Sequence, residues 1–336
     1  MRRALRHAPE WAPQRGLLLA WPFAGGDWAP ILDDIQREYC ALIQTVLNYQ
    51  SVYLVVQPGC YDAHRQLGQR RGLVYIEAPY NDTWCRDYGP IGLHGEAPIT
   101  VLDCVFNGWG GRHEAGLDNR VNAHLAQQPQ LLDVTFQQSP LELEGGAIDS
   151  DGEQHLLVNL HCLRTRWSSL DPAAIEARLT GLLGLQTVLA IDLPPLPGDD
   201  TDGHIDTLAR FVRPGLLAYQ TLGNSRLQCA FEAQLDKLAE RHHGPLRHCA
   251  LPCPDDLDPK LPASYANFVL INGAVLVPQY GSHADAAAID CFRRWLPERI
   301  IEAVDARCLI QQGGGPHCAT MQLPPLTANH TPIYEP

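Results

Sequence analysis

The chain has 336 residues, of which 45% are hydrophobic and 19% are charged, and its formal net charge is −13 at pH 7. This composition is typical of a globular protein that buries a large core. The negative charge argues against nucleic acid as a partner, because phosphate binding needs basic surface, and it mildly favours a cationic ligand. No run approaches the roughly 18 apolar residues of a membrane span, and prolines follow the basic start Met1–His7. We therefore expect a cytoplasmic protein with no membrane partner.

Helix-like and strand-like stretches alternate along the chain, which predicts an α/β fold. The predicted helices are Asp33–Leu47, Gly116–Leu125, Pro172–Leu183, Arg226–Arg241 and Ala284–Leu296. The predicted strands are Ser51–Val56, Val74–Ala78, Ile99–Phe106, Leu131–Phe136, His155–Leu160, Thr187–Ile191, Leu216–Tyr219, Phe268–Val277 and Arg307–Gln311. The last four helices begin roughly 55 residues apart, which indicates about five copies of one supersecondary unit. No linker divides the chain, so we expect a single domain over residues 1–336, with a tail from about residue 324.

Eleven cysteines without the spacing of a disulfide scaffold predict mostly buried, reduced thiols. Cys318 stands apart, because it follows the run Gly313–His317, whose three glycines let the backbone approach a ligand closely. A cysteine attacks as a thiolate and needs a cationic neighbour or a base to lower its pKa. His317 is adjacent in sequence, and His204 is a second candidate for that role. The spacing of the other cysteines completes no zinc site, so we predict no metal.

Three acidic motifs are further candidates. If His204-Ile205-Asp206 is a strand, the imidazole and the carboxylate point to one face; the alternative is a half-buried strand with a hydrogen-bonded histidine. Asp87 precedes a predicted turn, and its alternative is a local ion pair with Arg86. Glu144 precedes two glycines where the chain bends, and its alternative is a surface position.

Tryptophan adds one more candidate. Trp84 lies among Asp82, Arg86 and Asp87, where it would form a face for a planar cation. Its alternative is a core position.

Taken together, these motifs resemble agmatine deiminases and the related Porphyromonas-type peptidyl-arginine deiminases. The matching segments, in chain order, are Pro9–Pro13, Leu19–Pro22, Asn81–Pro90, Phe106–Gly111, Glu144–Gly146, Asp200–Phe211, Pro262–Phe268 and Gly313–Cys318. The resemblance implies a five-bladed, pseudo-symmetric α/β propeller of the pentein type, with the site at its centre. A propeller of five units would account for the helix recurrence.

The resemblance also implies the role of each candidate. Cys318 would attack the guanidinium carbon, and His204 would protonate the departing ammonia and then activate water. Asp87 and Asp206 would bind the guanidinium nitrogens, as carboxylates do through charge-assisted hydrogen bonds. The implied substrate-binding residues are Asp200, which would meet a distal amine, Trp84 and Trp109, which would line the channel, and Asp82, Glu144, Asn267 and Gly315. No metal or organic cofactor is implied.

The leading hypothesis is hydrolysis of agmatine to N-carbamoylputrescine and ammonia through an S-alkylthiouronium on Cys318. A rival is deimination of free or peptidyl arginine, for which Arg112 or Arg210 would have to meet a carboxylate. Pro316 alone separates Gly315 from His317, so the loop is one residue shorter than the family pattern. An amidinotransferase and a catalytically inactive guanidine-binding protein are further alternatives. A homo-oligomer is a candidate assembly that the sequence leaves open.

Overall fold

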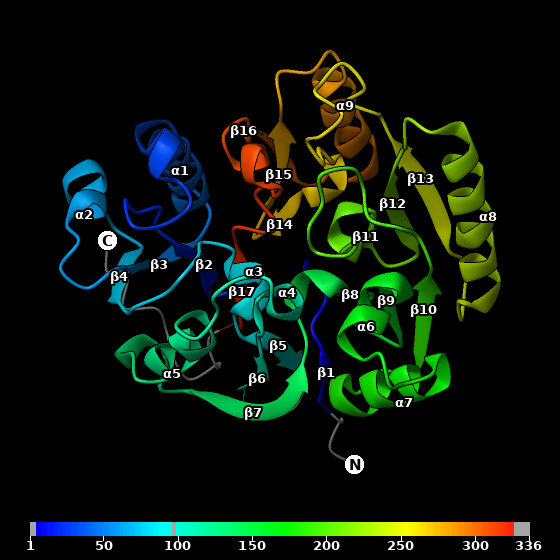
Figure 1. The fold of residues 1–336 in the computed structure, drawn as a ribbon, viewed down its shortest axis with the longest axis horizontal. Helices are drawn as coiled ribbons and strands as arrows, with labels where there is room; N and C mark the ends of the chain where they lie inside the picture. Colours follow the sequence, from blue (N-terminus) through cyan, green and yellow to red (C-terminus); the bar gives the residue numbers. More distant parts are fainter. Residues whose placement is uncertain (1–4, 96–98, 326–336) are drawn as a thin grey trace.

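The computed structural model describes residues 5–95 and 99–325, whose strands form five separate sheets (Figure 1). The first two sheets have the strand orders β17-β2-β3-β4 and β1-β5-β6-β7, and the other three are β10-β9-β8, β11-β12-β13 and β14-β15-β16. The strands are β1 (Arg6–His7), β2 (Gly16–Ala20), β3 (Ser51–Val56), β4 (Leu73–Glu77), β5 (Ile91–His94), β6 (Ile99–Val105), β7 (Val134–Glu142), β8 (Ile148–Ser150), β9 (His155–Asn159), β10 (Thr187–Ile191), β11 (Ala209–Arg213), β12 (Leu216–Gln220), β13 (Arg247–Leu251), β14 (Val269–Ile271), β15 (Ala274–Gln279), β16 (Ile300–Asp305) and β17 (Met321–Leu323).

The longer helices lie outside the sheets, and α3 lies near the middle of the view in Figure 1. The helices are α1 (Leu32–Leu47), α2 (Asp62–Leu67), α3 (Cys85–Tyr88), α4 (Gly108–Gly111), α5 (Val121–Leu125), α6 (Leu160–Arg166), α7 (Pro172–Leu183), α8 (Ser225–Arg241) and α9 (Asp285–Trp295). The ends of α7 show how the sequence sets these bounds. Asp171 accepts the backbone N–H of Ala174, Pro172 occupies the first turn, and Gly184 ends the helix with a left-handed conformation.

One unit recurs in the five described sheets. In four of them a strand pairs antiparallel with the next strand, which in turn pairs parallel with a third strand that follows one or more helices. In the fifth, β17 from the other end of the described chain takes the first place, antiparallel to β2, and β2 pairs parallel with β3. In one sheet, for example, β11 and β12 are antiparallel, and β12 and β13 are parallel with α8 between them. The expectations of an α/β fold and of a repeated unit are confirmed.

Three predicted strands are wrong in type or extent. Leu131–Phe136 overlaps only the start of β7, which continues to Glu142, and its first residue belongs to a short 3₁₀ helix over Pro129–Leu131. Arg307–Gln311 is not a strand, because β16 ends at Asp305 and a short 3₁₀ helix spans Leu309–Gln312. The carboxylate of Glu38 accepts the backbone N–H groups of Cys308 and Leu309 at 2.8 and 3.0 Å, so these donors are unavailable to a sheet. Phe268–Val277 contains two strands, β14 and β15, separated by a turn at Gly273 with φ of 77°.

All eleven cysteines are unpaired, as expected, but only five of them are buried. The buried cysteines are Cys85, Cys104, Cys162, Cys291 and Cys318. Cys40 and Cys308 are half-buried and pack against the edge of the core.

The two ends of the chain meet in one sheet, because β17 pairs antiparallel with β2. Of the predicted tail, Pro324 and Pro325 follow β17, and residues 326–336 lie outside the described residues. Within the described ranges, no helix has both the length and the apolar character to cross a membrane.

Candidate active site

A small cavity of about 60 Å³ gathers six of the predicted site residues. They are Asp82, Trp84, Asp87, Trp109, Asp200 and Cys318. These side chains come from segments far apart in the sequence, so the fold creates the cavity. His204, Asp206, Glu144 and Asn267 are buried around it.

The glycine loop that delivers Cys318 is packed too tightly for any other residue type. A Cβ atom on Gly314 would lie 2.4 Å from the ring of Trp84, and one on Gly315 would lie 2.6 Å from Oδ1 of Asn267. The same Oδ1 accepts the backbone N–H of Cys318 at 3.3 Å, and Nδ2 of Asn267 lies 3.1 Å from its Sγ. Asn267 therefore positions both the backbone and the thiol of Cys318.

His204 is buried between two carboxylates. Its Nδ1 lies 3.6 Å from Oδ1 of Asp87, and its Nε2 lies 3.7 Å from Oε2 of Glu144. Neither ring nitrogen has a hydrogen-bond partner among the described residues. Burial alone would lower the pKa of His204, but Asp87, the thiol of Cys162 and Glu144 raise it well above the usual value. His204 is therefore an imidazolium with free N–H groups, which is a general acid ready to donate.

Asp87 accepts hydrogen bonds from two uncharged donors, which do not neutralise its negative charge. Its Oδ2 accepts Nε1–H of Trp109 and its Oδ1 accepts the backbone N–H of Gly146, each at 2.9 Å. Burial and the carboxylates of Asp206 and Glu144 raise the pKa of Asp87 to about 6. The local ion pair with Arg86 is absent among the described contacts, because that guanidinium faces Glu10 instead, at 3.8 Å.

Asp206 is completely buried beside the nucleophile. Its Oδ2 lies 2.7 Å from Nδ1 of His317 and 3.6 Å from Sγ of Cys318. Its Oδ1 has no hydrogen-bond partner in the described part of the chain, so it is free to accept one from a substrate. Burial raises the pKa of Asp206, but the hydrogen bond from His317 and the charges of His204 and Arg210 outweigh burial and hold the pKa below its usual value.

The strand predicted for His204-Ile205-Asp206 is wrong. His204 precedes a 3₁₀ helix over Ile205–Thr207, and β11 begins only at Ala209. The two side chains still converge, because the residue between them, Gly146, has no side chain to separate them. A Cβ atom there would lie 2.6 Å from Nδ1 of His204 and 3.1 Å from Oδ2 of Asp206.

The environment of Cys318 differs from the expectation that a histidine lowers its pKa. Among the described contacts Sγ meets Asn267 and Asp206 and no imidazole, since His317 turns to Asp206 and Glu10. Burial and the carboxylates of Asp206 and Asp87 raise the pKa of the Cys318 thiol well above its usual value. The thiol therefore stays protonated until a positive charge enters the cavity.

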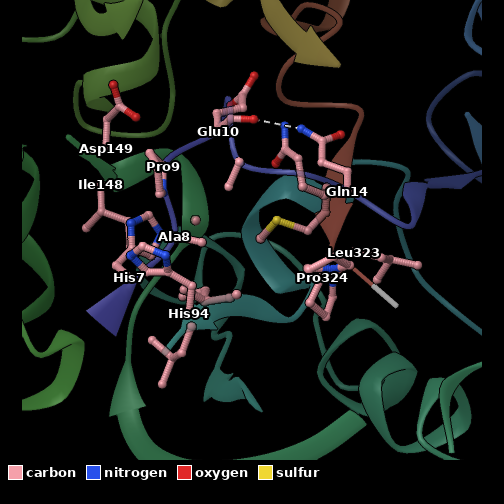
Figure 2. Close-up of a pocket in the computed structure, with 18 of the residues that line it drawn as sticks. His7, Ala8, Pro9, Glu10, Gln14, His94, Ile148, Asp149, Leu323 and Pro324 are labelled. Atoms are coloured by element: carbon pink, nitrogen blue, oxygen red, sulfur yellow. Dashed lines mark hydrogen bonds between the residues drawn. The ribbon is translucent and has the colours of Figure 1, made fainter. Parts of the chain in front are cut away.

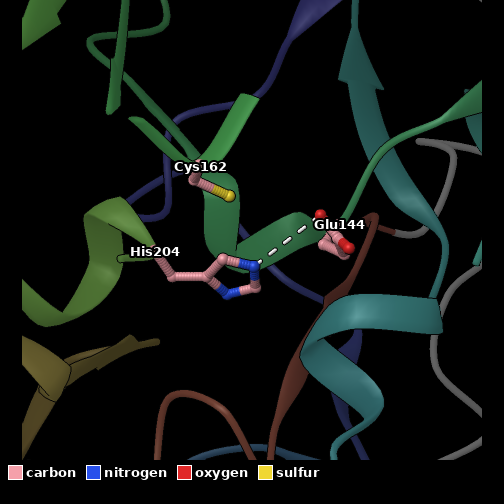
Figure 3. Close-up of side chains that lie close together, drawn as sticks. All are labelled: Glu144, Cys162 and His204. Atoms are coloured by element: carbon pink, nitrogen blue, oxygen red, sulfur yellow. Dashed lines mark ion pairs between the residues drawn. The ribbon is translucent and has the colours of Figure 1, made fainter. Parts of the chain in front are cut away.

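Glu144, Cys162 and His204 form a compact group whose donor atoms all lie within 4.8 Å of one another (Figure 3). Such a set resembles a metal site. The guanidinium of Arg166, however, lies 2.6 Å from Oε1 of Glu144 and already supplies a positive charge. The group therefore fits an ion-pair network around His204 better than a cation site.

The mouth of the cavity is acidic. Asp200 has 57% of its side chain exposed there, and Asp27 and Asp82 line the same cavity. Burial and the nearby charge of Asp27 raise the pKa of Asp82 to about 6. His113 lies 3.4 Å from Asp200, and no arginine or lysine is among the described lining residues.

The two arginines considered as carboxylate ligands are engaged elsewhere. Arg112 pairs with Asp202, and Arg210 is buried against Glu10.

Several residues of the site escaped prediction. Asp27, His113, Cys162 and Arg166 lie in segments with no recognisable motif. Glu10 and His317 lie inside matched motifs, and the sequence contains no signal that they contact each other.

This chain is similar along nearly all of its length to known deiminases. A family model described as Porphyromonas-type peptidyl-arginine deiminase matches residues 6–324. The agmatine deiminase of Pseudomonas putida is 32% identical over 356 residues, which cover 95% of this chain and 95% of that protein. A solved structure of C. jejuni agmatine deiminase, a cysteine-to-serine variant with substrate bound, has a TM-score of 0.87 at 30% identity and covers 96% of each chain.

The match extends over almost every described element, from β1 to β17. The chain belongs to the Porphyromonas-type peptidyl-arginine deiminase family.

Proposed function

We propose that this chain is an agmatine deiminase, which hydrolyses agmatine to N-carbamoylputrescine and ammonia. The observation that carries the proposal is a small cavity lined by the Cys318 thiol and the Asp87 carboxylate, with His204 buried beside Asp87 and Asp206 buried beside Cys318. A guanidinium offers N–H groups in a plane, which carboxylates bind through paired, charge-assisted hydrogen bonds. The agmatine deiminases to which this chain is similar support the choice of substrate.

The proposed reaction begins when the guanidinium binds between Asp87 and Asp206. Its positive charge offsets the carboxylates that keep the Cys318 thiol protonated. The thiol then releases its proton to water, and the thiolate attacks the central carbon. The C–N bond breaks as the imidazolium of His204 donates a proton to the departing ammonia. An S-alkylthiouronium remains on Cys318.

The second half of the reaction reverses the role of His204. The imidazole, now neutral, takes a proton from water while the water oxygen attacks the thiouronium carbon. The C–S bond then breaks, and the product carries the urea oxygen. Glu144 and Asp87 stabilise the imidazolium that forms again, since both face its ring nitrogens.

The acidic mouth supports agmatine over arginine. The distal amine of agmatine is cationic and would meet Asp200, Asp82 and Asp27. Arginine carries the same ammonium group but also a carboxylate on the same carbon. Without a lining arginine or lysine among the described residues, the carboxylate would be repelled.

The same proposal includes the arrangement of the whole chain. The five sheets would be the blades of a pseudo-symmetric, five-bladed pentein propeller within one domain over residues 1–336. The recurring strand order and the five-fold count of sheets among the described residues support it. The proposal includes a cytoplasmic location and leaves the oligomeric state open.

The test is ammonia release from agmatine, arginine and an arginine-ended peptide, measured in parallel with the purified protein. We expect turnover of agmatine and at least a hundredfold lower kcat/KM for arginine, because about 3 kcal/mol separates a paired from a repelled terminal charge. Cys318→Ala should abolish turnover. Cys229→Ala, which changes an exposed cysteine, should leave turnover unchanged.

Each other outcome rejects part of the proposal. Faster turnover of the peptide would assign a peptidyl-arginine deiminase, and ammonia release that survives Cys318→Ala would reject the nucleophile. Agmatine binding without any turnover would indicate a binding protein.

A further inference from the structure

A second cavity lies behind the catalytic loop. It has a volume of about 210 Å³, and His7, Glu10, Arg86, Asp149 and His317 are among its lining residues (Figure 2). Cys318 lines the substrate cavity, whereas the preceding residue, His317, lines this second cavity. Neighbouring residues of one loop therefore face two different spaces.

His317 makes one short contact toward the substrate cavity and one toward the second cavity. Its Nδ1 lies 2.7 Å from Oδ2 of Asp206, and its Nε2 lies 2.7 Å from Oε2 of Glu10. All three side chains are at least nine-tenths buried. Carboxylate oxygens are acceptors when ionised, so each of the two contacts needs one proton. A neutral imidazole supplies one of these protons, whereas an imidazolium supplies both.

Glu10 is itself fixed at the other end of this chain of contacts. Its Oε1 accepts the backbone N–H of Leu270 at 2.6 Å, and its Oε2 also pairs with Arg210. The guanidinium of Arg86 donates to the carbonyl oxygen of His317 at 3.2 Å. The anchor therefore reaches from β14 to the residue before the nucleophile.

We propose that His317 is a positioning residue that, anchored by Glu10, holds Asp206 ionised and oriented for the guanidinium. This inference rests on the proposed function. Oδ2 of Asp206 is occupied by His317, which leaves the unpartnered Oδ1 to the substrate. Without the contact, a completely buried carboxyl would take up a proton and lose its attraction for a cation.

Four charged groups face His317, and burial together with the two arginines among them outweighs the two carboxylates and holds the pKa of His317 below its usual value. They are the carboxylates of Asp206 and Glu10 and the guanidiniums of Arg86 and Arg210. The hydrogen bond from His317 is the largest of the effects that lower the pKa of Asp206 against its burial. Loss of this bond should therefore raise the pKa of Asp206 and move the acidic limb of kcat/KM to higher pH.

The experiment compares two amides at position 317. In His317→Asn the amide nitrogen occupies the place of Nδ1 and still reaches Asp206, whereas in His317→Gln it occupies the place of Nε2 and reaches only Glu10. We measure agmatine affinity by calorimetry in the Cys318→Ala background from about pH 5 to pH 8. We expect His317→Gln to weaken binding about tenfold or more at pH 6, with partial recovery at pH 8. His317→Asn should stay within about threefold of the parent.

His155→Gln is the matched control. It replaces another buried histidine that is paired with a carboxylate, Asp151, outside both cavities. It should leave agmatine affinity unchanged at every pH. Equal losses in His317→Asn and His317→Gln, or unchanged binding in His317→Gln, would overturn the proposal, because a role in packing alone does not distinguish the two amides by pH.

A second measurement needs no agmatine and separates this inference from the proposed function. The rate at which iodoacetamide alkylates Cys318, followed by mass spectrometry, depends on the charge of Asp206, because that charge raises the pKa of the thiol. Protonated Asp206 in His317→Gln should make alkylation about threefold faster at pH 6. If Cys318→Ala binds no agmatine, the proposed function fails, and an unchanged alkylation rate would reject the role of His317 as well.

Discussion

A buried histidine lies near each end of strand β9, and the two histidines differ in their hydrogen bonding. At its first residue, His155 contacts Oδ2 of Asp151 through Nδ1 at 2.5 Å and accepts the backbone N–H of His243 through Nε2 at 3.0 Å. At its last residue, Asn159 donates to the carbonyl oxygen of Gly203 at 2.8 Å. Gly203 precedes His204, whose ring nitrogens face Asp87 and Glu144 without a hydrogen bond to any described residue. About 13 Å of strand separates the two ends.

The carboxylates differ in the same way. Oδ1 of Asp151 accepts three backbone N–H groups, from residues 153, 154 and 155, and these bonds together with His155 outweigh burial and hold the pKa of Asp151 below its usual value. Among the described contacts Asp87 accepts only two hydrogen bonds, from Trp109 and Gly146, and burial together with the carboxylates of Asp206 and Glu144 raises its pKa to about 6. Hydrogen-bonded groups stabilise the fold, and groups left unpartnered beside a cavity are available for chemistry.

The largest difference between the two ends of β9 is expected when each of the two histidines is replaced. His204→Gln should lower kcat on agmatine about 10²- to 10⁴-fold, because the amide cannot donate a proton to ammonia. His155→Gln should leave kcat within about twofold while lowering the free energy of unfolding by about 1–3 kcal/mol, since it breaks a buried hydrogen bond to a charged group. Steady-state kinetics and urea unfolding of both variants are the measurements. A large loss of kcat in His155→Gln would mean that the two ends of β9 are coupled.

The sequence predicts elements with local signals well, and predicts poorly the segments whose conformation depends on distant residues. Pro172–Leu183 and Thr187–Ile191 match α7 and β10 residue for residue, because capping residues and β-branched runs set their bounds locally. The 3₁₀ helix after His204 and the one at Leu309–Gln312 were predicted as strands. Their conformation depends on partners distant in sequence, such as Glu38, which local patterns do not contain.

The candidate site shows the same division. Motifs single out Cys318, Asp87 and Asp206 individually, and in the structure these side chains lie close together. Neither the raised pKa of Cys318 nor the contact of His317 with Glu10 follows from residue types. The raised pKa depends on burial. The contact joins residues that are 307 positions apart in the sequence.

Two glycines sharpen the comparison between the site and the surrounding scaffold. Gly146→Ala would place a Cβ atom 2.6 Å from Nδ1 of His204 and 2.8 Å from Oδ1 of Asp87, so both groups must move. We expect kcat/KM to fall about a hundredfold, the usual cost of displacing catalytic groups by about 1 Å. Gly181→Ala lies in α7 with nothing within 4 Å of its Cβ, so activity should persist and stability should rise by about 1 kcal/mol. Unchanged kinetics in Gly146→Ala would show that His204 and Asp87 are not held as the structure places them.

The smallest expected difference concerns how Asp87 and Asp151 each contribute to the free energy of unfolding. The folded pKa of Asp87, about 6, lies above the usual value near 3.9, so the folded state binds the proton more tightly and loses stability as the pH rises between these values. Asp87→Asn removes this cost and should raise the free energy of unfolding by about 1–3 kcal/mol at pH 7, with no gain near pH 4.

Asp151 has the opposite linkage, because its folded pKa is depressed. Its contribution to stability is present above the unfolded pKa and is lost as the pH falls through the folded pKa, so Asp151→Asn should destabilise by about 1–2 kcal/mol at pH 7 and by less at low pH. Urea unfolding of both variants from about pH 4 to pH 7 measures the two trends. Parallel trends in the two variants would show that Asp87 is stabilised by its neighbours, and that the catalytic cavity imposes no cost on the fold.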